Sequence, residues 1–576
     1  MWSVKSAAVV ALIIWVIVLL YLSQSLFSLQ GKADSYADAS GVTSRLDEAL
    51  SNIRELKKQN DRLQEMIQQE RKDRDGLDKR RLKETEKVEK LNRIRENREE
   101  PVKLQEVAPK PLSEQGAASG PSRVGEELRR GLDQRIWEIF YYLRSEFKKS
   151  DKEPSYKNHT IDQLIHLLAY SSNISDTQAD WRKASLEALS ERIQKKIDEI
   201  QNPDDCAKAR VLVCNLDKQC GFGCQLHHVG YCFTVAFGEG RTLILTNDGK
   251  SWRYSKRGWS GAFLPISKCT HAAAVNGEGV ASYRQNSERR VVELPIVDAL
   301  QDRPKTLPLS FPKQLEDEMI KLHSNPPLYF ISQFLWYLMR NNAEMEKVIE
   351  KAVSNVPFGE GPIVGIQVRR TDKIGTEASF HSVDEYMEWT EIWFRVQELR
   401  RGHPLKRRVF VASDDASVLP ETKKKYSNYE VFGDVDIADT AKLMSRYSDA
   451  SMYGVVTDIQ LLSRCDYLVC TFSSQVCRMG YELMQVRRPD GEAFHSLDDL
   501  YYYGGQHDHQ QIVIEDHVPE RDNEIELKVG DSVGVAGNHW DGYSKGKNRR
   551  TQRQGLYPSY KVIEKWRIID FPVFNN

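Results

Sequence analysis

The chain has 576 residues, enough for about four domains of ordinary size. Hydrophobic residues make up 40% and charged residues 29% of it, which excludes a collagen-like or wholly disordered protein. Lys and Arg number 82 against 83 Asp and Glu, so a net charge of -1 gives the chain no overall attraction for nucleic acid. We therefore expect a multidomain globular protein whose ligand is not a nucleic acid.

An uncharged apolar segment, Ala7 to Leu22, lies near the N-terminus. With the flanking residues up to Ser28 it approaches the roughly 17 to 25 residues that cross a bilayer. A cleaved signal peptide is the alternative, but the apolar run is longer than in such peptides and no A-x-A site follows it. Lys5 places the N-terminus in the cytoplasm. We therefore expect a cytoplasmic tail at 1–6, a transmembrane signal anchor at 7–28 and a luminal remainder.

The cysteines support a luminal location. Six of the nine fall between Cys206 and Cys269, and Cys470 and Cys477 lie close together. In an oxidising compartment this pattern predicts a disulfide framework, whereas a zinc site would need paired CxxC spacing that these intervals lack. Nine is an odd number, and Cys465 is the expected free thiol. Two sequons, at Asn158 and Asn173, fit the same side of the membrane.

Residues 29–123 are expected to form a stem. Four leucines in it are separated by multiples of seven, namely Leu56, Leu63, Leu77 and Leu91. This broken heptad pattern fits a weak coiled coil or merely a solvated stem with partial helix. The run rich in Pro, Gly and Ser from Pro101 to Pro121 predicts a flexible linker.

Residues 124–203 have the apolar period of two long amphipathic helices. One apolar stripe is Leu128, Leu132, Ile136, Phe140 and Leu143, and the other is Leu186, Leu189, Ile193, Ile197 and Ile200. Ser175 with Gln178 has the pattern of a capping box, and Pro203 ends the second helix. The stripes fit either packing within the chain or a helical dimerisation region in a homodimer.

Two α/β lobes are expected next, and together they predict a two-lobed α/β protein. Strand patterns at 242–246 and 291–295, among Gly-rich loops, indicate a first lobe over 204–360. Apolar runs and amphipathic helices alternate over 361–500, as in a Rossmann-like, doubly wound lobe. The strands expected there are 363–368, 409–412, 430–432 and 467–470, and the helices are 383–399 and 455–463.

Polar clusters follow three of these strands, at 369–373, 413–415 and 471–475. Ligands of open parallel sheets bind beyond the carboxyl ends of the strands, so the three loops should converge on one crevice. Arg369 and Arg370 can present a charged fork to a diphosphate, although an adjacent arginine pair is more often surface charge. The absence of a Walker or kinase glycine-rich loop argues against phosphoryl transfer. The D-x-D at Asp434 and Asp436 is not taken as a metal site, because a charged loop supplies this pattern by chance and the arginines could neutralise a diphosphate without metal. The paired histidines lack metal-ligand spacing.

The segment 505–567 is expected to form a separate SH3-like β-barrel. Gly530-Asp531, His539-Trp540 and the Tyr557-Pro558 pair follow the strand and turn order of such barrels. The aromatic Ala-Leu-Tyr-Asp-Tyr element of the proline groove is missing. The barrel should therefore do something other than bind proline-rich motifs.

Four motifs give the chain a strong resemblance to a known family. They are V-R-R-T-D-K-I-G-T-E at 368–377, D-I-Q-L-L-S from Asp458, V-C-T-F-S-S-Q-V-C-R at 469–478 and G-N-H-W-D-G-Y-S-K-G at 537–546. In these motifs the chain resembles the eukaryotic alpha-1,6-fucosyltransferases of N-glycan core fucosylation, over essentially its whole length. The resemblance implies a Golgi type II membrane enzyme that transfers fucose from GDP-fucose to O6 of the innermost GlcNAc. It also implies an inverting reaction without metal or other cofactor.

Site residues follow from the resemblance motif by motif. The catalytic residues implied are Glu377 as general base, Lys373 as its partner and Arg369 on the β-phosphate. The implied donor-binding set is Arg369, Arg370, Asp372, Tyr254, Asp414, Asp415, Asp458 and Ser474. The implied acceptor-binding set is Lys218, Asp298, Gln475, Asp499 and His539. One departure is Gln367, where the family commonly has histidine before the motif.

The resemblance also implies a disulfide pattern. It pairs Cys206 with Cys269, Cys214 with Cys232, Cys220 with Cys224, and Cys470 with Cys477. Two other functions stay open at this point, a glycan-binding protein without catalysis and a luminal scaffold. A glycan-binding protein without catalysis would lack the general base and the arginine fork. A scaffold would need no polar clusters after its strands.

Overall fold

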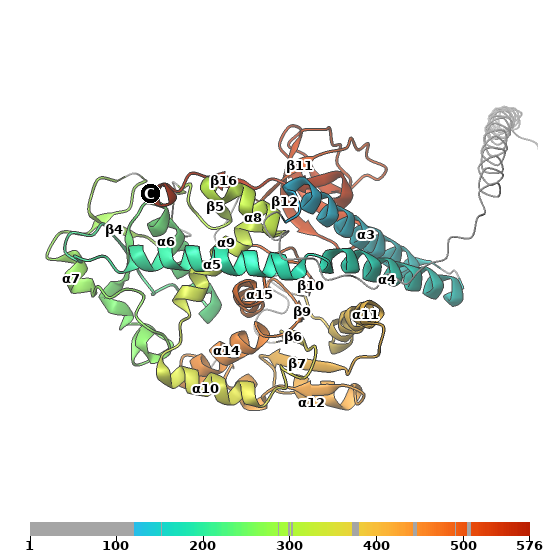
Figure 1. Ribbon diagram of the computed structural model, residues 1–576, viewed down its shortest axis with the longest axis horizontal. Helices are drawn as coiled ribbons and strands as arrows, with labels where there is room; N and C mark the ends of the chain where they lie inside the picture. Colours follow the sequence, from blue (N-terminus) through green and yellow to red (C-terminus); the bar gives the residue numbers. More distant parts are fainter. Residues whose placement is uncertain are drawn as a thin grey trace, which may run out of the picture. The chain divides into compact units, whose positions relative to one another are not determined.

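Figure 1 shows the computed structural model of the protein, which describes residues 120–150, 153–285, 287–297, 300, 303–370, 379–441, 446–489, 491–503 and 509–575. The predicted tail, anchor and nearly all of the stem lie outside these ranges. Within them, no helix is both long and apolar enough to cross a membrane.

Three helices, and not the predicted two, come first: α3 (Arg123–Lys149), α4 (Pro154–Asp176) and α5 (Ala179–Gln201). The Ser122 hydroxyl starts α3 by accepting a hydrogen bond from the Gly125 N–H at 3.1 Å. The predicted capping box at Ser175 is wrong, because Ser175 lies in the last turn of α4 and α5 begins after Gln178 without a side-chain cap. The Ser175 hydroxyl instead accepts a hydrogen bond from Arg129.

The predicted apolar stripe of α3 is buried at one end and exposed to solvent at the other. Ile136 and Phe140 are buried in the same core as the second lobe, whereas Leu128 is 70% and Leu132 is 51% exposed. The stripe of α5 is buried in the core of the first lobe, apart from the partly buried Ile200. The helical region is therefore part of the same folded body as the two lobes, and it still leaves apolar side chains exposed.

The first lobe has a parallel sheet of β1 (Val211–Cys214), β2 (Thr242–Leu245), β3 (Ala281–Ser282) and β4 (Val291–Leu294), in the order β2-β1-β4-β3. Its helices are α6 (Phe222–Gly238), α7 (His271–Val275), α8 (Glu316–Leu322), α9 (Pro326–Leu338) and α10 (Ala343–Ser354). Every described side chain of α6 except Cys224 is buried, so this helix forms the centre of the lobe.

The second lobe is a doubly wound sheet. Its strands are β6 (Val364–Val368), β7 (Arg408–Ser413), β8 (Glu430–Phe432), β9 (Tyr467–Cys470) and β10 (Phe494–Ser496). All are parallel, in the order β10-β9-β6-β7-β8. The chain adds β7 and β8 on one side of β6 and then β9 and β10 on the other, so the strand order reverses between β6 and β9. Its helices are α11 (Val383–Arg401), α12 (Val418–Lys425), α13 (Val435–Thr440), α14 (Asp449–Leu462) and α15 (Gln475–Arg487). In Figure 1, β6, β7 and β9 lie between α11 and the pair α14 and α15.

The C-terminal barrel has five antiparallel strands: β11 (Gln510–Val513), β12 (Ser532–Asn538), β13 (Tyr543–Asn548), β14 (Gln554–Pro558) and β15 (Val562–Glu564). It packs on α3, where Trp540 meets Tyr141 with ring centroids 5.4 Å apart. The chain then returns to the first lobe, because β16 (Arg567–Ile569) pairs with β5 (Ser310–Pro312). Figure 1 shows the C-terminus beside this pair. The fold class predicted from the sequence is thus confirmed for the described residues.

Four disulfide bonds join the pairs that the resemblance implies: Cys206–Cys269, Cys214–Cys232, Cys220–Cys224 and Cys470–Cys477. Cys465 is free and buried, and burial raises the pKa of its thiol well above the ordinary value. Three of the bonds lie in the first lobe, and the fourth ties β9 to α15.

Candidate active site

Three polar loops meet at the carboxyl edge of the second sheet. Arg369 and Arg370 follow β6, and Asp414 and Asp415 follow the neighbouring β7. The Arg370 N–H donates to Asp414 Oδ1 at 2.8 Å, and its guanidinium donates to Glu421 at 2.7 Å. The two loops are thus tied together, and Arg370 is held by carboxylates. Glu421 was not identified from the sequence, where it is one more charge in a charged helix.

The third loop follows β9 on the other side of β6. The hydroxyl oxygens of Thr471, Ser473 and Ser474 are buried there, and none has a hydrogen-bond partner among the described residues. The same is true of the Gln367 side-chain oxygen at the end of β6. Ser474 immediately precedes α15, and a helix N-terminus attracts anions. Buried polar atoms without hydrogen-bond partners among the described residues make this edge of the sheet a candidate binding site.

Asp498 shapes this third loop and was missed in the sequence. Its carboxylate accepts hydrogen bonds from the Phe472 N–H at 2.7 Å and the Ser473 N–H at 3.1 Å. It follows β10 in the same way that the other polar clusters follow their strands. The rule that located those clusters would have found Asp498, had β10 been predicted.

The first turn of α6 gathers three predicted site residues. Tyr254 packs edge-on against Phe222 with ring centroids 5.5 Å apart, and Gln225 donates to the Lys218 carbonyl at 2.7 Å. A Cβ on Gly223 would stand 2.6 Å from the Cβ of Gln475, so the two main chains lie in close contact. Lys218 and Tyr254 thus contact residues in the first turn of α6, and Gln475 of the second lobe packs against Gly223 in the same turn.

Asp499 connects this region to the barrel. Its Oδ1 accepts a hydrogen bond from the Asn538 N–H at 3.3 Å, next to the exposed His539. A Cβ on Gly537, whose φ is +153°, would stand 3.2 Å from the same oxygen. Burial raises the pKa of the Asp499 carboxyl above its ordinary value.

Asp458 lies on α14, with its side chain buried. Burial, together with the nearby Asp434 carboxylate, raises the pKa of Asp458 well above its ordinary value. Asp434 itself caps α13 by accepting a hydrogen bond from the Asp436 N–H at 2.9 Å. The D-x-D pattern thus begins a helix here.

Four of the predicted residues lie outside the described residues. They are Asp298, Asp372, Lys373 and Glu377. The structure therefore gives the surroundings of the arginine loop but not the position of the expected general base.

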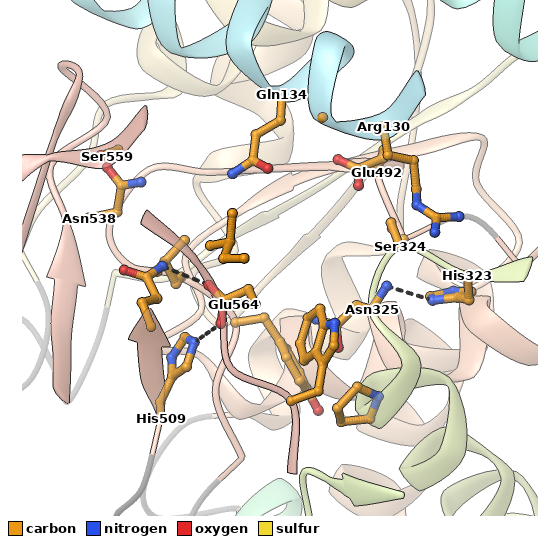
Figure 2. Close-up of a pocket in the computed structure, with 18 of the residues that line it drawn as sticks. Arg130, Gln134, His323, Ser324, Asn325, Glu492, His509, Asn538, Ser559 and Glu564 are labelled. Carbon is orange, nitrogen blue, oxygen red and sulfur yellow. Dashed lines mark hydrogen bonds and ion pairs between the residues drawn. The ribbon is translucent and has the colours of Figure 1, made fainter. Parts of the chain in front are cut away.

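Two other features resemble ligand sites. Cys214, His228 and Cys232 offer three ligand atoms within 4.8 Å of one another, but the two sulfur atoms are joined in a disulfide. A cavity of about 590 Å³ lies between α3, the segment before α9 and the barrel, lined by Arg130 and Glu564 among others (Figure 2). None of the described site residues predicted from the sequence lines this cavity.

Comparison with known proteins identifies close relatives. Residues 1–502 match the family described as Alpha-(1,6)-fucosyltransferase N- and catalytic domains, and residues 513–562 match the Variant SH3 domain family. A Caenorhabditis elegans protein named Alpha-(1,6)-fucosyltransferase is 46% identical over 574 residues, covering 98% of this chain and 99% of that protein. A Drosophila melanogaster protein of the same name is 43% identical over 471 residues, covering 79% and 75%.

Two solved structures resemble parts of the chain. The fucosyltransferase NodZ from Bradyrhizobium matches at 17% identity with a TM-score of 0.28, covering 48% of this chain and 92% of that chain. The SH3 domain of yeast NBP2 matches at 30% identity with a TM-score of 0.10, covering 10% and 97%. With TM-scores this low, the two structures add nothing to the near full-length sequence matches.

Proposed function

Because the chain belongs to the alpha-(1,6)-fucosyltransferase family and is a fucosyltransferase, we propose that it transfers L-fucose from GDP-fucose to O6 of the innermost N-acetylglucosamine of N-glycans. The reaction inverts the anomeric carbon and needs no metal ion. The bond between fucose C1 and the diphosphate oxygen breaks, a bond from C1 to the acceptor O6 forms, and the O6 proton passes to a general base.

The observation that carries this proposal is the arrangement of polar side chains at the carboxyl ends of β6 and β9, where the strand order of the sheet reverses. Arg369 and Arg370 follow β6, and the buried hydroxyls of Thr471, Ser473 and Ser474 follow the adjacent β9. An arginine fork binds a diphosphate through charge-assisted hydrogen bonds, and it stabilises the negative charge left on GDP when the C1–O bond breaks. The arginines thus supply the positive charge that a metal ion supplies elsewhere.

The nucleoside is assigned to Asp458 and Tyr254. Guanine offers two adjacent N–H donors, and the Asp458 carboxylate can accept a hydrogen bond from each. These two hydrogen bonds offset the free-energy cost of ionising a buried carboxyl group. Tyr254 borders the ribose from the first lobe. Asp414 and Asp415 hold the arginine loop in place, since Asp414 accepts the Arg370 N–H.

Catalysis and acceptor binding are assigned from the motifs. Glu377 is the general base, Lys373 keeps it charged, and Asp372 braces the arginines. The acceptor glycan contacts Lys218, Asp298, Gln475, Asp499 and His539. Gln225 in the first turn of α6 donates to the Lys218 carbonyl, and Gln475 packs against Gly223 in the same turn. Asp499 adjoins the barrel strand that precedes His539.

We further propose that the enzyme is a homodimer in the Golgi membrane, a single-pass type II protein anchored through residues 7–28. Disulfide bonds suit an oxidising lumen. Exposed apolar side chains on α3 and α4 suit a second copy, with Leu128 at 70% and Tyr170 at 69% exposure.

One experiment tests the reaction and its metal independence together. The luminal chain is incubated with GDP-fucose and a truncated biantennary glycopeptide in EDTA, and the product is mapped by mass spectrometry. Fucose on O6 of the innermost GlcNAc is expected. Loss of transfer in EDTA that Mn²⁺ restores would contradict the role given to Arg369.

A further inference from the structure

We propose that His227 is a positioning residue for the acceptor. It fixes the side-chain amide of Gln475 so that the amide N–H donors, and not the carbonyl oxygen, face the glycan. The inference rests on the proposed function, which places Gln475 at the acceptor. It assigns a role to a buried histidine that is far from Gln475 in sequence.

His227 is held from both sides. The residue is 2% exposed, and its side chain projects from α6 toward α15. Nδ1 is hydrogen-bonded to Gln475 Oε1, and Nε2 lies 2.9 Å from Oε2 of Glu482, which is completely buried. One imidazole ring therefore joins the first residue of α15 to a residue two turns later.

The directions of these bonds decide what Gln475 can offer. Both ring nitrogens of His227 face oxygen atoms, and an oxygen facing N–H accepts the bond. The Gln475 carbonyl oxygen is thus occupied by the ring. The amide nitrogen, at the other end of the same group, is left to donate.

The surrounding groups keep the ring from turning. Tyr501 donates to Glu482 Oε1 at 2.6 Å, and Tyr503 donates to the His227 carbonyl at 2.8 Å while its ring packs edge-on against the imidazole. A Cβ on Gly230 would stand 2.4 Å from the Tyr503 hydroxyl, so this approach requires glycine. The charged groups near the ring and its tyrosines are Glu482 and Arg478, both on α15.

The exposed side of Gln475 meets the proposed acceptor position. Its side chain is only partly buried, and no described residue is seen to accept a hydrogen bond from its amide nitrogen. The neighbouring Gly223 belongs to the first turn of α6, in which Gln225 donates to the Lys218 carbonyl. A sugar hydroxyl or an N-acetyl carbonyl oxygen could accept the bond there.

The direction of the amide is tested by Gln475→Glu. This change keeps an oxygen for His227 Nδ1 and replaces the donor group by a second acceptor. We expect the acceptor KM to rise about 10-fold at pH 7.5, with the donor KM unchanged, because a sugar acceptor atom then faces an oxygen. An unchanged acceptor KM would mean that the carbonyl oxygen faces the glycan, and would overturn the proposal.

The role of His227 is tested by a double-mutant cycle with His227→Phe and Gln475→Met. Each single variant should raise the acceptor KM, and the double variant should be no worse than Gln475→Met alone, because His227 acts only through Gln475. Additive effects would overturn the proposal. Gln475→Glu leaves the pair of His227 and Glu482 in place. Its acceptor KM therefore tests the direction of the Gln475 amide even where His227→Phe fails to fold.

A matched control is a second buried histidine that binds a glutamine of α15. His323 binds the buried Gln485 of α15 through Nε2 at 2.9 Å, away from the sheet edge. His323→Phe should lower the unfolding temperature without changing the acceptor KM. GDP affinity, measured by calorimetry, should stay normal in every variant that folds. Transfer by the wild-type chain tests the proposed function separately, so its failure is not confused with failure of the His227 role.

Discussion

The main-chain N–H of Arg370 donates to Asp414 Oδ1 at 2.8 Å, so the loops after β6 and β7 are held together by one carboxylate. The Arg370 guanidinium is bound in turn by Glu421 at 2.7 Å, and Phe380 lies 5.3 Å from it. Arg370, which is proposed to present positive charge to a diphosphate, is therefore held in place without a bound ligand. Such preorganisation lowers the cost of binding.

Asp414→Ala should weaken GDP binding about 10-fold, because the Arg370 N–H loses its acceptor and the loop loses its tie to β7. Asp414→Asn keeps a side-chain oxygen and should recover most of the affinity. Calorimetry with GDP measures both. Asp436→Ala, which removes an exposed carboxylate on α13, is the control and should bind GDP normally.

Glu377→Gln should bind GDP about normally and lose roughly 10² to 10⁴ in turnover, the typical value of general base catalysis. Arg369→Ala should damage donor binding and turnover together, because the same cation binds the donor and stabilises the leaving group. GDP affinity measured beside the transfer rate separates the two roles. Near-normal turnover in Glu377→Gln would require a different base.

The double variant Leu128→Glu and Leu132→Glu should weaken the proposed dimer, because these residues are 70% and 51% exposed and charge at an apolar interface is unfavourable. Removing residues 124–201 would be a poorer test, since Ile136 and Phe140 belong to the core of the second lobe. Sedimentation velocity measures the change. A dimer of unchanged strength would place the interface elsewhere.

His539→Ala should raise the acceptor KM several-fold with little effect on the unfolding temperature, because the side chain is exposed. Deleting residues 505–576 is less informative, since β16 pairs with β5 of the first lobe and would be lost too. If His539→Ala transfers fucose with normal kinetics, the barrel does not contact the glycan through this residue.

The sequence predicted the second sheet well because its strands are short apolar runs between clear breakers. The ends of β6, β7 and β9 agree with the predicted strands to within one residue. It missed α4 as a separate helix, and it assigned Ser175 to a cap, whereas the Ser175 hydroxyl binds Arg129 from another helix.

The contact between Glu482 and His227 also could not be predicted from the sequence. Each looks like an ordinary member of its helix in sequence, and their partnership exists only because α6 and α15 pack together. Local patterns report which face of a helix is apolar. They do not report which buried polar groups from distant segments will satisfy one another.

The final prediction concerns Glu138, on α3 where it meets the barrel. Its side chain is buried, and Oε2 has no hydrogen-bond partner among the described residues. Burial, with a contribution from the Asp541 carboxylate, raises the pKa of Glu138 from 4.5 to about 7. In the unfolded chain the group loses its proton near the ordinary value.

The folded protein therefore binds more protons than the unfolded chain between pH 4.5 and about 7, so this group lowers the free energy of unfolding as pH rises through that window. Glu138→Gln does not titrate. The variant should gain stability relative to wild type by up to about 3 kcal/mol between pH 4.5 and pH 8. Thermal unfolding of both proteins across this range measures the change, and parallel curves would contradict it.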